Sequence, residues 1–198
     1  MLLSIKEIRK LYYSNGFSAN EIATIKKLTV WQIIKFMKKN NLPRRKSNES
    51  NNLRFERQEK SFKLKSELSP MEEKIKISSC MLYWAEGVKS VNGHAVDFVN
   101  SDPEMISIFL KFLRDICGAS EKKLRVLLYC YADQNCEELL DYWSNLTKIP
   151  KEQFQKPYIR KDFNPNGRKM VRGLVHIRYN DKKLYRQLLD WINEYKNL

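Results

Sequence analysis

One carboxylate closes an apolar run in the middle of this chain. Residues 78–90 read SSCMLYWAEGVKS, with Glu86 standing directly before Gly87. A carboxylate delivered by a helix end could bind a divalent cation, because hard cations such as Mg²⁺ prefer oxygen ligands. A surface Glu is more often a solvated helix end with no chemical role. Glu86 is therefore a candidate metal ligand, and the solvated alternative stays open.

Other residues that do chemistry in proteins are sparse. The four cysteines stand far apart without a C-x-x-C pair, and there are only two histidines, so we do not expect a zinc site. His176 lies between Val175 and Ile177 on a predicted strand, which favours packing or a place on the sheet surface over a ligand role. The sequence contains no P-loop, no G-x-S-x-G and no H-E-x-x-H. These patterns give no support to nucleotide, serine-hydrolase or zinc-protease chemistry.

The charge of the chain indicates a polyanionic partner. The net charge is +14, from 37 basic and 23 acidic residues. Residues 1–47 carry eleven basic and two acidic side chains, a net of +9, whereas residues 70–198 carry 21 and 17, a net of +4. Lys and Arg neutralise phosphates and release counterions. A basic first quarter joined to a larger, less charged part is typical of a nucleic-acid-binding module with a second domain.

Length and composition fit a folded protein of one medium domain or two small ones. The chain has 198 residues, 42% of them apolar and 12% aromatic. No apolar run approaches the roughly 20 residues of a membrane span. The first residues, MLLSIKEIRK, place their charges after their apolar residues, the reverse of a signal peptide. We therefore expect a cytoplasmic chain with reduced cysteines, no membrane partner and no small-molecule cofactor.

The first 46 residues predict three helices. Apolar positions at helical spacing predict a first helix from about Ser4 to Ser14. Ser18 with Glu21 three residues later forms a capping box that starts the second helix. Thr29 is a good N-cap for a third helix that runs to about residue 40. Two short helices joined by a tight turn follow the helix-turn-helix plan.

The order Gly-Phe-Ser-x-x-Glu-Ile-Ala, then Thr-Val, Ile-Ile and Asn-Leu-Pro-Arg-Arg, resembles the helix-turn-helix of resolvases and related regulators. The resemblance implies that the third helix enters the major groove of double-stranded DNA. It implies base contacts from Thr29, Trp31, Gln32 and Lys35, and phosphate contacts from Lys38, Lys39, Arg44 and Arg45. Residues 44–46 resemble an arm that enters the minor groove. Alternatively, Trp31 packs in the three-helix core, the lysines form a solvated face and the arm is disordered.

Residues 47–69 lack apolar periodicity and predict a linker, part-helical near 53–62. Residues 70–198 predict an α+β domain with about four strands. Pro70 opens a helix, and Asp102-Pro103 caps a second one that ends at Gly118. HAVDFVNSD and KLRVLLYCYAD predict strands, and CEELLDYWSNL predicts a helix. QKPYIRKDF and MVRGLVHIRY predict a hairpin around NPNG, before a final helix in DKKLYRQLLDWINEY.

A helix running into LYWAEG, a strand, and then NSDPEMISIFLKFLRDICG resembles the LAGLIDADG homing-endonuclease fold over most of residues 70–198. The resemblance implies an α-β-β-α-β-β-α core with a curved antiparallel sheet that saddles DNA. It implies Arg125, Arg160, Lys161, Arg172 and Arg178 as further DNA contacts. Ala85-Glu86-Gly87 matches the end of the family motif, whereas Met81 stands where the motif has glycine and Trp84 where it has an acidic residue.

In that family two motif helices pack side by side, and each contributes an acidic residue that binds a divalent metal near the scissile phosphates. The resemblance therefore implies Glu86 as catalytic residue and Mg²⁺ ligand, and Gly87 as the residue that lets the chain turn out of the helix. Since this chain has one such helix, it implies a homodimer with Ser79, Leu82 and Tyr83 at the interface.

Three functional hypotheses stay open. The first is a metal-dependent, site-specific DNA endonuclease that acts as a homodimer. The second is a non-catalytic transcription regulator that uses the LAGLIDADG-like fold for dimerisation and DNA contact. The third is a structural module in which Glu86 is only a solvated helix end. The predicted helix-turn-helix favours site-specific DNA binding under either of the first two hypotheses.

Overall fold

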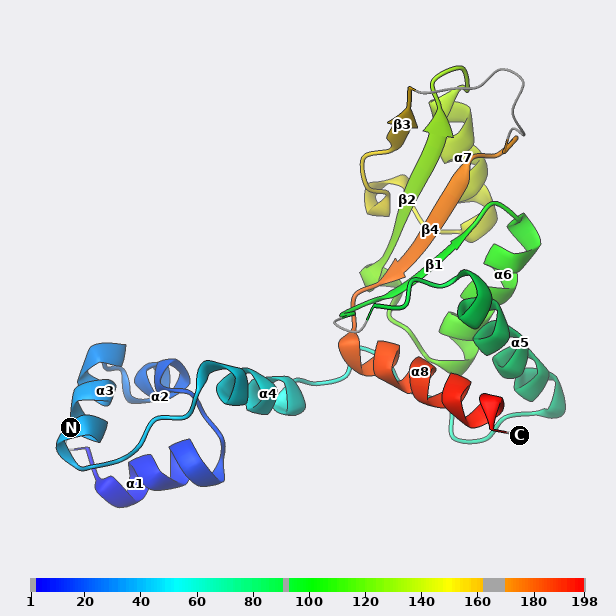
Figure 1. Cartoon of the computed structure of the whole chain (residues 1–198). Coiled ribbons are helices and arrows are strands. Elements are labelled where there is room, and N and C mark those ends of the chain that lie inside the picture. The colour runs from blue at the N-terminus through cyan, green and yellow to red at the C-terminus, as the bar shows by residue number, and fades with distance from the viewer. Residues whose placement is uncertain (1–2, 91–92, 162–169, 198) are drawn as a thin grey trace. The chain divides into compact units, whose positions relative to one another are not determined.

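The computed structural model of the chain describes residues 3–90, 93–161 and 170–197 (Figure 1). The chain divides into two compact units, Met1–Glu59 and Lys60–Leu198. Among the described residues, no helix is long and apolar enough to cross a membrane.

The first unit is built from four helices. Helix α1 (Ile5–Arg9) continues into a wider π-helical segment, Lys10–Ser14, and is followed by α2 (Ala19–Lys26), α3 (Val30–Lys39) and α4 (Ser47–Arg57). The core of this unit is formed by a cluster of buried side chains: Ile8, Tyr12, Ile22, Ala23, Ile33, Met37 and Leu42. The three helices predicted from apolar spacing are therefore present.

Two consecutive capping boxes frame the turn between α2 and α3. The Ser18 hydroxyl accepts a hydrogen bond from the Glu21 N–H at 3.2 Å, and the Glu21 carboxylate accepts one from the Ser18 N–H at 2.8 Å. Thr29 and Gln32 form the same arrangement at the start of α3. Lys27, with φ of 54°, ends α2 in the left-handed region. These bonds satisfy N–H groups that the first turn of each helix leaves unpaired.

Residues 47–57 differ from the predicted linker, because they form a helix that packs on the first unit. Leu53 lies beside Gly16, where an added Cβ would stand 3.7 Å from the Leu53 side chain. The Arg57 guanidinium lies 4.5 Å from the centre of the Phe17 ring and donates hydrogen bonds to the Glu21 carboxylate at 3.0 and 3.1 Å. Helix α4 therefore extends the first unit to residue 59.

The second unit is α+β, as the sequence predicts. In chain order it contains α5 (Pro70–Glu86), β1 (Val96–Asn100), α6 (Pro103–Lys111), β2 (Leu124–Tyr131), α7 (Cys136–Thr147), β3 (Tyr158–Arg160), β4 (Leu174–Tyr179) and α8 (Lys182–Lys196). A π-helical segment, Phe112–Ile116, prolongs α6, and single 3₁₀ turns occupy Glu121–Lys123 and Lys151–Gln153.

The four strands form one mixed sheet in the order β1-β4-β2-β3. Strand β4 is antiparallel to both β1 and β2, whereas β3 pairs parallel to β2, so the expectation of a purely antiparallel sheet was wrong. The predicted hairpin of β3 with β4 was also wrong, because β2 lies between them. The reason is α7, a crossover helix that returns the chain in the direction of β2. The NPNG segment itself lies outside the described residues.

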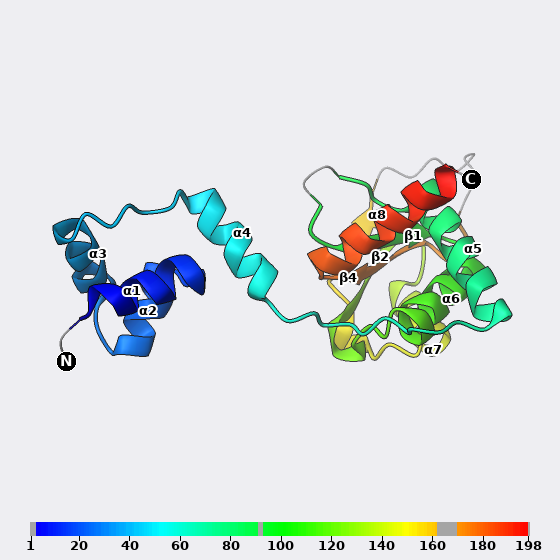
Figure 2. The ribbon, with the colours of Figure 1, turned by 90° about the horizontal axis from the view of Figure 1, so that it is seen from below.

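The two faces of this sheet have different surroundings. Every second residue of β2, from Leu124 to Cys130, is buried, and the residues between them are half-buried. The buried face joins a core with α5, α6 and α8 that includes Phe98, Phe109 and Trp143. In Figure 1 helix α7 lies behind β2, and no helix is drawn in front of β2 and β3; Figure 2 also places α6 and α7 together on one side. The opposite face, from here on the open face, is not covered by a helix there.

Candidate nucleic-acid interface

Helix α3 presents an exposed face that its own unit does not use. Ile33 and Met37 are buried, and the face opposite them carries Trp31, which is 64% exposed. The ammonium of Lys35 lies 4.6 Å from the centre of the Trp31 ring. The alternative in which Trp31 packs in the core is therefore wrong. The same helix also exposes Thr29, Gln32, Lys35, Lys38 and Lys39.

Thr29 and Gln32, the two polar residues at the start of this face, also cap the helix. The Thr29 hydroxyl accepts from the Gln32 N–H, and the Gln32 Oε1 accepts from the Thr29 N–H at 2.8 Å. Both side-chain oxygens are therefore used to cap α3. The Gln32 Nε2 amide group still has its donors available for an external acceptor.

The basic side chains near α3 divide into free and engaged ones. Lys38, Lys39 and Arg44 are exposed, and their side chains make no hydrogen bond or ion pair with the described residues. The Arg45 guanidinium instead donates to the Phe17 carbonyl at 2.6 Å and stacks 4.1 Å from the centre of the Tyr12 ring. Its backbone N–H donates to the Tyr12 hydroxyl at 2.9 Å. Arg45 anchors the chain after α3, and its predicted phosphate contact stays a prediction.

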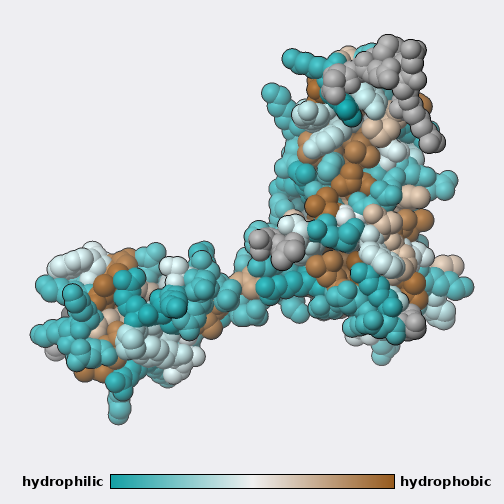
Figure 3. All heavy atoms as spheres, viewed as in Figure 1, coloured by the Kyte–Doolittle hydropathy of each residue, from teal (hydrophilic) through white to brown (hydrophobic). Residues whose placement is uncertain are grey.

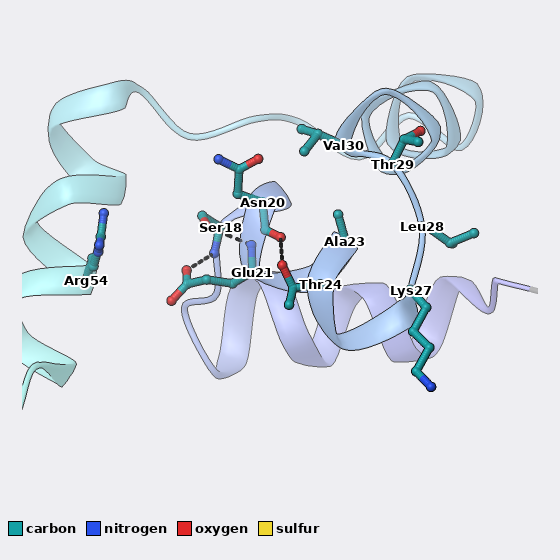
Figure 4. A pocket seen from close by; sticks show the side chains of 10 residues that line it. All are labelled: Ser18, Asn20, Glu21, Ala23, Thr24, Lys27, Leu28, Thr29, Val30 and Arg54. Carbon is teal, nitrogen blue, oxygen red and sulfur yellow. Dashed lines mark hydrogen bonds between the residues drawn. The ribbon is translucent and has the colours of Figure 1, made fainter.

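A polar hollow lies against α2 and the turn that follows it. Its volume is about 550 Å³. Figure 4 shows Asn20, Glu21 and Thr24 projecting from α2, with Arg54 of α4 standing across from them. The remaining lining residues are Ser18, Ala23, Lys27, Leu28, Thr29 and Val30. Figure 3 shows mostly hydrophilic residues over the visible face of this unit.

Two predicted DNA contacts meet on the open face of the sheet. Arg125 of β2 and Arg178 of β4 are register partners, and Asp97 of β1 is opposite Arg178. Arg178 donates to Asp97 at 2.8 Å and to Gln155 at 2.9 Å. His176 lies 2.9 Å from the second Asp97 oxygen, through its Nδ1. The Asp97 carboxylate therefore holds two basic side chains of the neighbouring strand in place.

The other three predicted contacts lie elsewhere. Arg160, the last residue of β3, and Lys161 are exposed at the edge of the sheet. The Arg172 guanidinium lies 4.9 Å from the ring of Tyr142 on α7, so it belongs to the helix-covered side of the unit. Arg125 and Arg178 therefore lie on neighbouring strands of the open face, where the Arg125 guanidinium donates to the carbonyls of Lys122 and Leu124 at 2.7 Å. Arg172 does not lie with them.

Glu86 is the last residue of α5 and is exposed. It makes no hydrogen bond or ion pair with the described residues. The Lys89 ammonium donates to the carbonyls of Trp84 and Gly87, at 2.7 and 2.9 Å, and so covers the end of the helix. No group of three or more His, Cys, Asp or Glu side chains is close enough to hold a metal ion in the described parts of the chain. Glu86 is therefore a single available carboxylate.

Gly87 is required for space and not for its freedom to turn. Its φ of −78° and ψ of 149° are ordinary extended values. An added Cβ would stand 2.5 Å from the Tyr83 carbonyl oxygen and 2.6 Å from the Tyr83 ring. The prediction that Gly87 permits a special turn is therefore replaced by a steric reason.

The predicted dimer-interface residues do not share a free surface. Ser79 and Tyr83 are fully buried in the core of their own unit, and the Tyr83 hydroxyl donates to the Val88 carbonyl at 2.9 Å. Neither has surface left for a second copy, and Leu82 is half-buried. The apolar side chains that α5 exposes are others, Met71, Ile77 and Trp84, at 64%, 43% and 45%.

Sequence reasoning missed Asn20, Arg54 and the Asp97–His176 pair. The pair is formed between strands 79 positions apart, and no local pattern signals it. Arg54 stands in a segment without apolar periodicity, which gave no helix to place it on. No known family model, no curated protein and no solved structure matches this chain.

Proposed function

We propose that this chain is a site-specific double-stranded DNA-binding protein whose first unit is a helix-turn-helix module. The observation that carries the proposal is the outward face of α3, where Trp31 is 64% exposed beside Lys35. A helix of this kind fits the major groove, with its first residues toward base edges. Exposed indole, amide and ammonium groups suit a surface that contacts bases and phosphates at once.

Charge and capping support the same function. Residues 1–59 carry thirteen basic and five acidic side chains, a net of +8. The two capping boxes fix where α2 and α3 begin, so the exposed residues of α3 are held on a rigid element. A rigid helix with a cationic surface loses little conformational entropy on binding DNA.

The test begins with selection of duplexes from a random pool by the full chain, followed by affinity measurements on the best site. We expect Trp31→Ala to weaken that binding about tenfold or more, since a base-edge contact is worth roughly 1–3 kcal/mol. Met71→Ala removes an equally exposed apolar side chain from the second unit and is the control. Failure to enrich any sequence would refute site-specific binding.

A second candidate function is cleavage of that DNA by a LAGLIDADG-like second unit. The order of its elements supports the resemblance. An isolated bridge joins Gly87 to Phe98 directly after α5, where the family order has its first strand. With that bridge, the order α5, bridge, β1, α6, β2, β4, α8 matches α-β-β-α-β-β-α, and α7 with β3 stands as an addition between β2 and β4.

Glu86 is the observation that favours cleavage, because it is exposed and unengaged at the end of the first helix of this order. One carboxylate does not make a metal site, but Mg²⁺ is commonly held by one or two carboxylates together with substrate phosphates. A homodimer would supply two copies of Glu86. Bound Mg²⁺ would stabilise negative charge on the phosphodiester under attack. Without cleavage, the same dimer would serve a transcription regulator.

Cleavage is tested on the selected duplex with Mg²⁺ and with Mn²⁺. If the nuclease function is present, Glu86→Gln abolishes strand scission and leaves DNA affinity nearly unchanged. Glu73→Gln, an exposed glutamate of the same helix, is the matched control and keeps activity. If the wild-type protein binds its site tightly and never cuts it with either metal, the nuclease function is refuted and the regulator remains.

A further inference from the structure

Helix α4 borders a groove on the first unit. Three neighbouring hollows, of about 550, 440 and 240 Å³, lie between α4 and the pair α2–α3. The first and second share Glu21 and Arg54, the second and third share Asn51, and the first and third share Asn20. Because neighbouring hollows share lining residues, they lie side by side past the start of α2, and together they are called the groove.

The four arginines of residues 44–57 have two distinct roles. Arg45 and Arg57 hold the segment onto the helical core, through the Phe17 carbonyl and the Glu21 carboxylate. Arg44 and Arg54 line the groove, are exposed, and make no hydrogen bond or ion pair with the described residues. One pair of guanidinium groups therefore fixes α4, and the other pair is left available.

The rest of the lining mixes apolar side chains, such as Leu28, Val30 and Phe55, with uncharged polar ones and the exposed Lys27. Asn20 and Asn51 are exposed, and no hydrogen bond of their side-chain amides to another described residue is formed. The one carboxylate, Glu21, accepts hydrogen bonds from Ser18 and Arg57. An apolar peptide would leave these amides and guanidinium groups unpaired. A chain of phosphodiesters would pair them, because guanidinium groups and amides are the usual donors to DNA backbone oxygens.

We propose that this groove binds the sugar–phosphate backbone of DNA, with Arg44 and Arg54 as phosphate ligands and Asn20 and Asn51 as neutral donors. The inference rests on the proposed DNA-binding function and deepens it. Helix α3 contacts bases, and the groove on its flank holds the backbone beside them. These contacts fix position and affinity and carry no sequence information.

The experiment compares three full-length variants, Arg44→Ala, Arg54→Ala and Arg9→Ala. Arg9 is an exposed arginine of α1 that does not line the groove, so its variant makes the same change in charge. Affinity is measured across a salt series, on the duplex selected by the wild-type protein and on a mixed-sequence duplex. Each groove variant should bind both duplexes about tenfold more weakly. The slope of log affinity against log salt should fall by roughly 0.9 for each lost phosphate contact. Arg9→Ala should keep the wild-type slope.

The inference is overturned if Arg54→Ala and Arg44→Ala show the slope and affinity of Arg9→Ala. It is also overturned if either groove variant weakens binding to the selected duplex alone, since that marks a base contact. If the wild-type protein binds neither duplex, the proposed function itself fails, which is a different result. Neither arginine side chain has a hydrogen-bond or ion-pair partner among the residues that the structure describes, so circular dichroism and the thermal midpoint should match the wild type. Arg54→Lys, which keeps the charge, should recover part of the slope.

Discussion

Two glycines share a left-handed backbone conformation and differ in the space beside them. Gly16 has φ of 69° and Gly118 has φ of 56°. An added Cβ at Gly16 would meet Leu53 at 3.7 Å, which is ordinary contact. At Gly118 it would stand 2.2 Å from the Lys63 carbonyl oxygen. We therefore predict that Gly118→Ala destabilises its unit much more than Gly16→Ala destabilises the other.

The magnitudes follow from the backbone. Alanine in the left-handed region costs about 1–2 kcal/mol at either position. At Gly118 the clash also pushes away the segment of residues 63–65, which bonds to Gly118 and Ile116 through two backbone hydrogen bonds of 3.3 and 2.9 Å. Losing both adds about 1 kcal/mol each, for a total of roughly 3–4 kcal/mol.

The assay is urea unfolding of the full chain in a Trp31→Phe background, followed by tryptophan fluorescence; the remaining three tryptophans lie in the second unit, and Trp143 is the fully buried one. With an m value of about 2 kcal/mol/M, Gly118→Ala should lower that midpoint by roughly 1.5–2 M. Gly16→Ala should leave the Trp143 transition unmoved and weaken only the helical signal of the first unit. A Gly118→Ala midpoint within about 0.5 M of the wild type would refute the steric reasoning.

Two further predictions concern protonation. Partial burial acts to raise the pKa of Glu21, but hydrogen bonds from Ser18 and Arg57 outweigh this effect and lower that pKa from 4.5 to about 2. The ionised carboxylate stabilises the first unit fully above about pH 4.5, and this stabilisation is lost as the pH falls toward 2. The free energy of unfolding of the first unit should therefore fall less between neutral pH and pH 2 in Glu21→Gln than in the wild type. Equal losses in the two proteins would contradict this. Burial raises the pKa of Cys80 to about 12, so a thiol reagent at neutral pH should label Cys136, which is partly exposed, well before Cys80; equal labelling rates of the folded protein would contradict the burial.

Local signals were enough to predict where helices begin. Ser18, Thr29 and Asp102 each cap the helix that follows them, as predicted, because a cap depends on residues within one turn. The α+β class followed from apolar spacing for the same reason. Sheet order was not predictable in this way. The turn signal around NPNG favoured pairing of the flanking strands, but β3 found its partner in β2, across α7.

Side-chain roles were harder to predict than elements. Arg45 sits in a run of three basic residues typical of a DNA-binding arm, yet Tyr12 and the Phe17 carbonyl bind it, and both are about 30 positions away in the chain. Arg54 shows the converse. Its proposed phosphate contact depends on the position of α4, which Arg57 holds through a hydrogen bond to Glu21, 36 positions away. Charge patterns therefore predict a kind of partner, DNA, which stays a prediction, and they do not predict which cations the fold leaves available.

The geometry of α5 sets a specific demand on any two-copy metal site. Helix residues advance by about 100° each, so Glu86 points roughly 160–180° away from the outward side of α5 that carries the exposed Ile77 and Trp84. Pairing along that outward side would leave Glu86 beside the interface and not inside it. Two such carboxylates could hold metal ions against shared phosphates only below the end of the helices, where Lys89 already covers the carbonyls of Trp84 and Gly87. An ammonium in that place would attract DNA phosphates whether or not a metal joined them, so this end of α5 would suit the proposed binding protein as it stands, and the proposed cleavage would require a metal held beside Lys89.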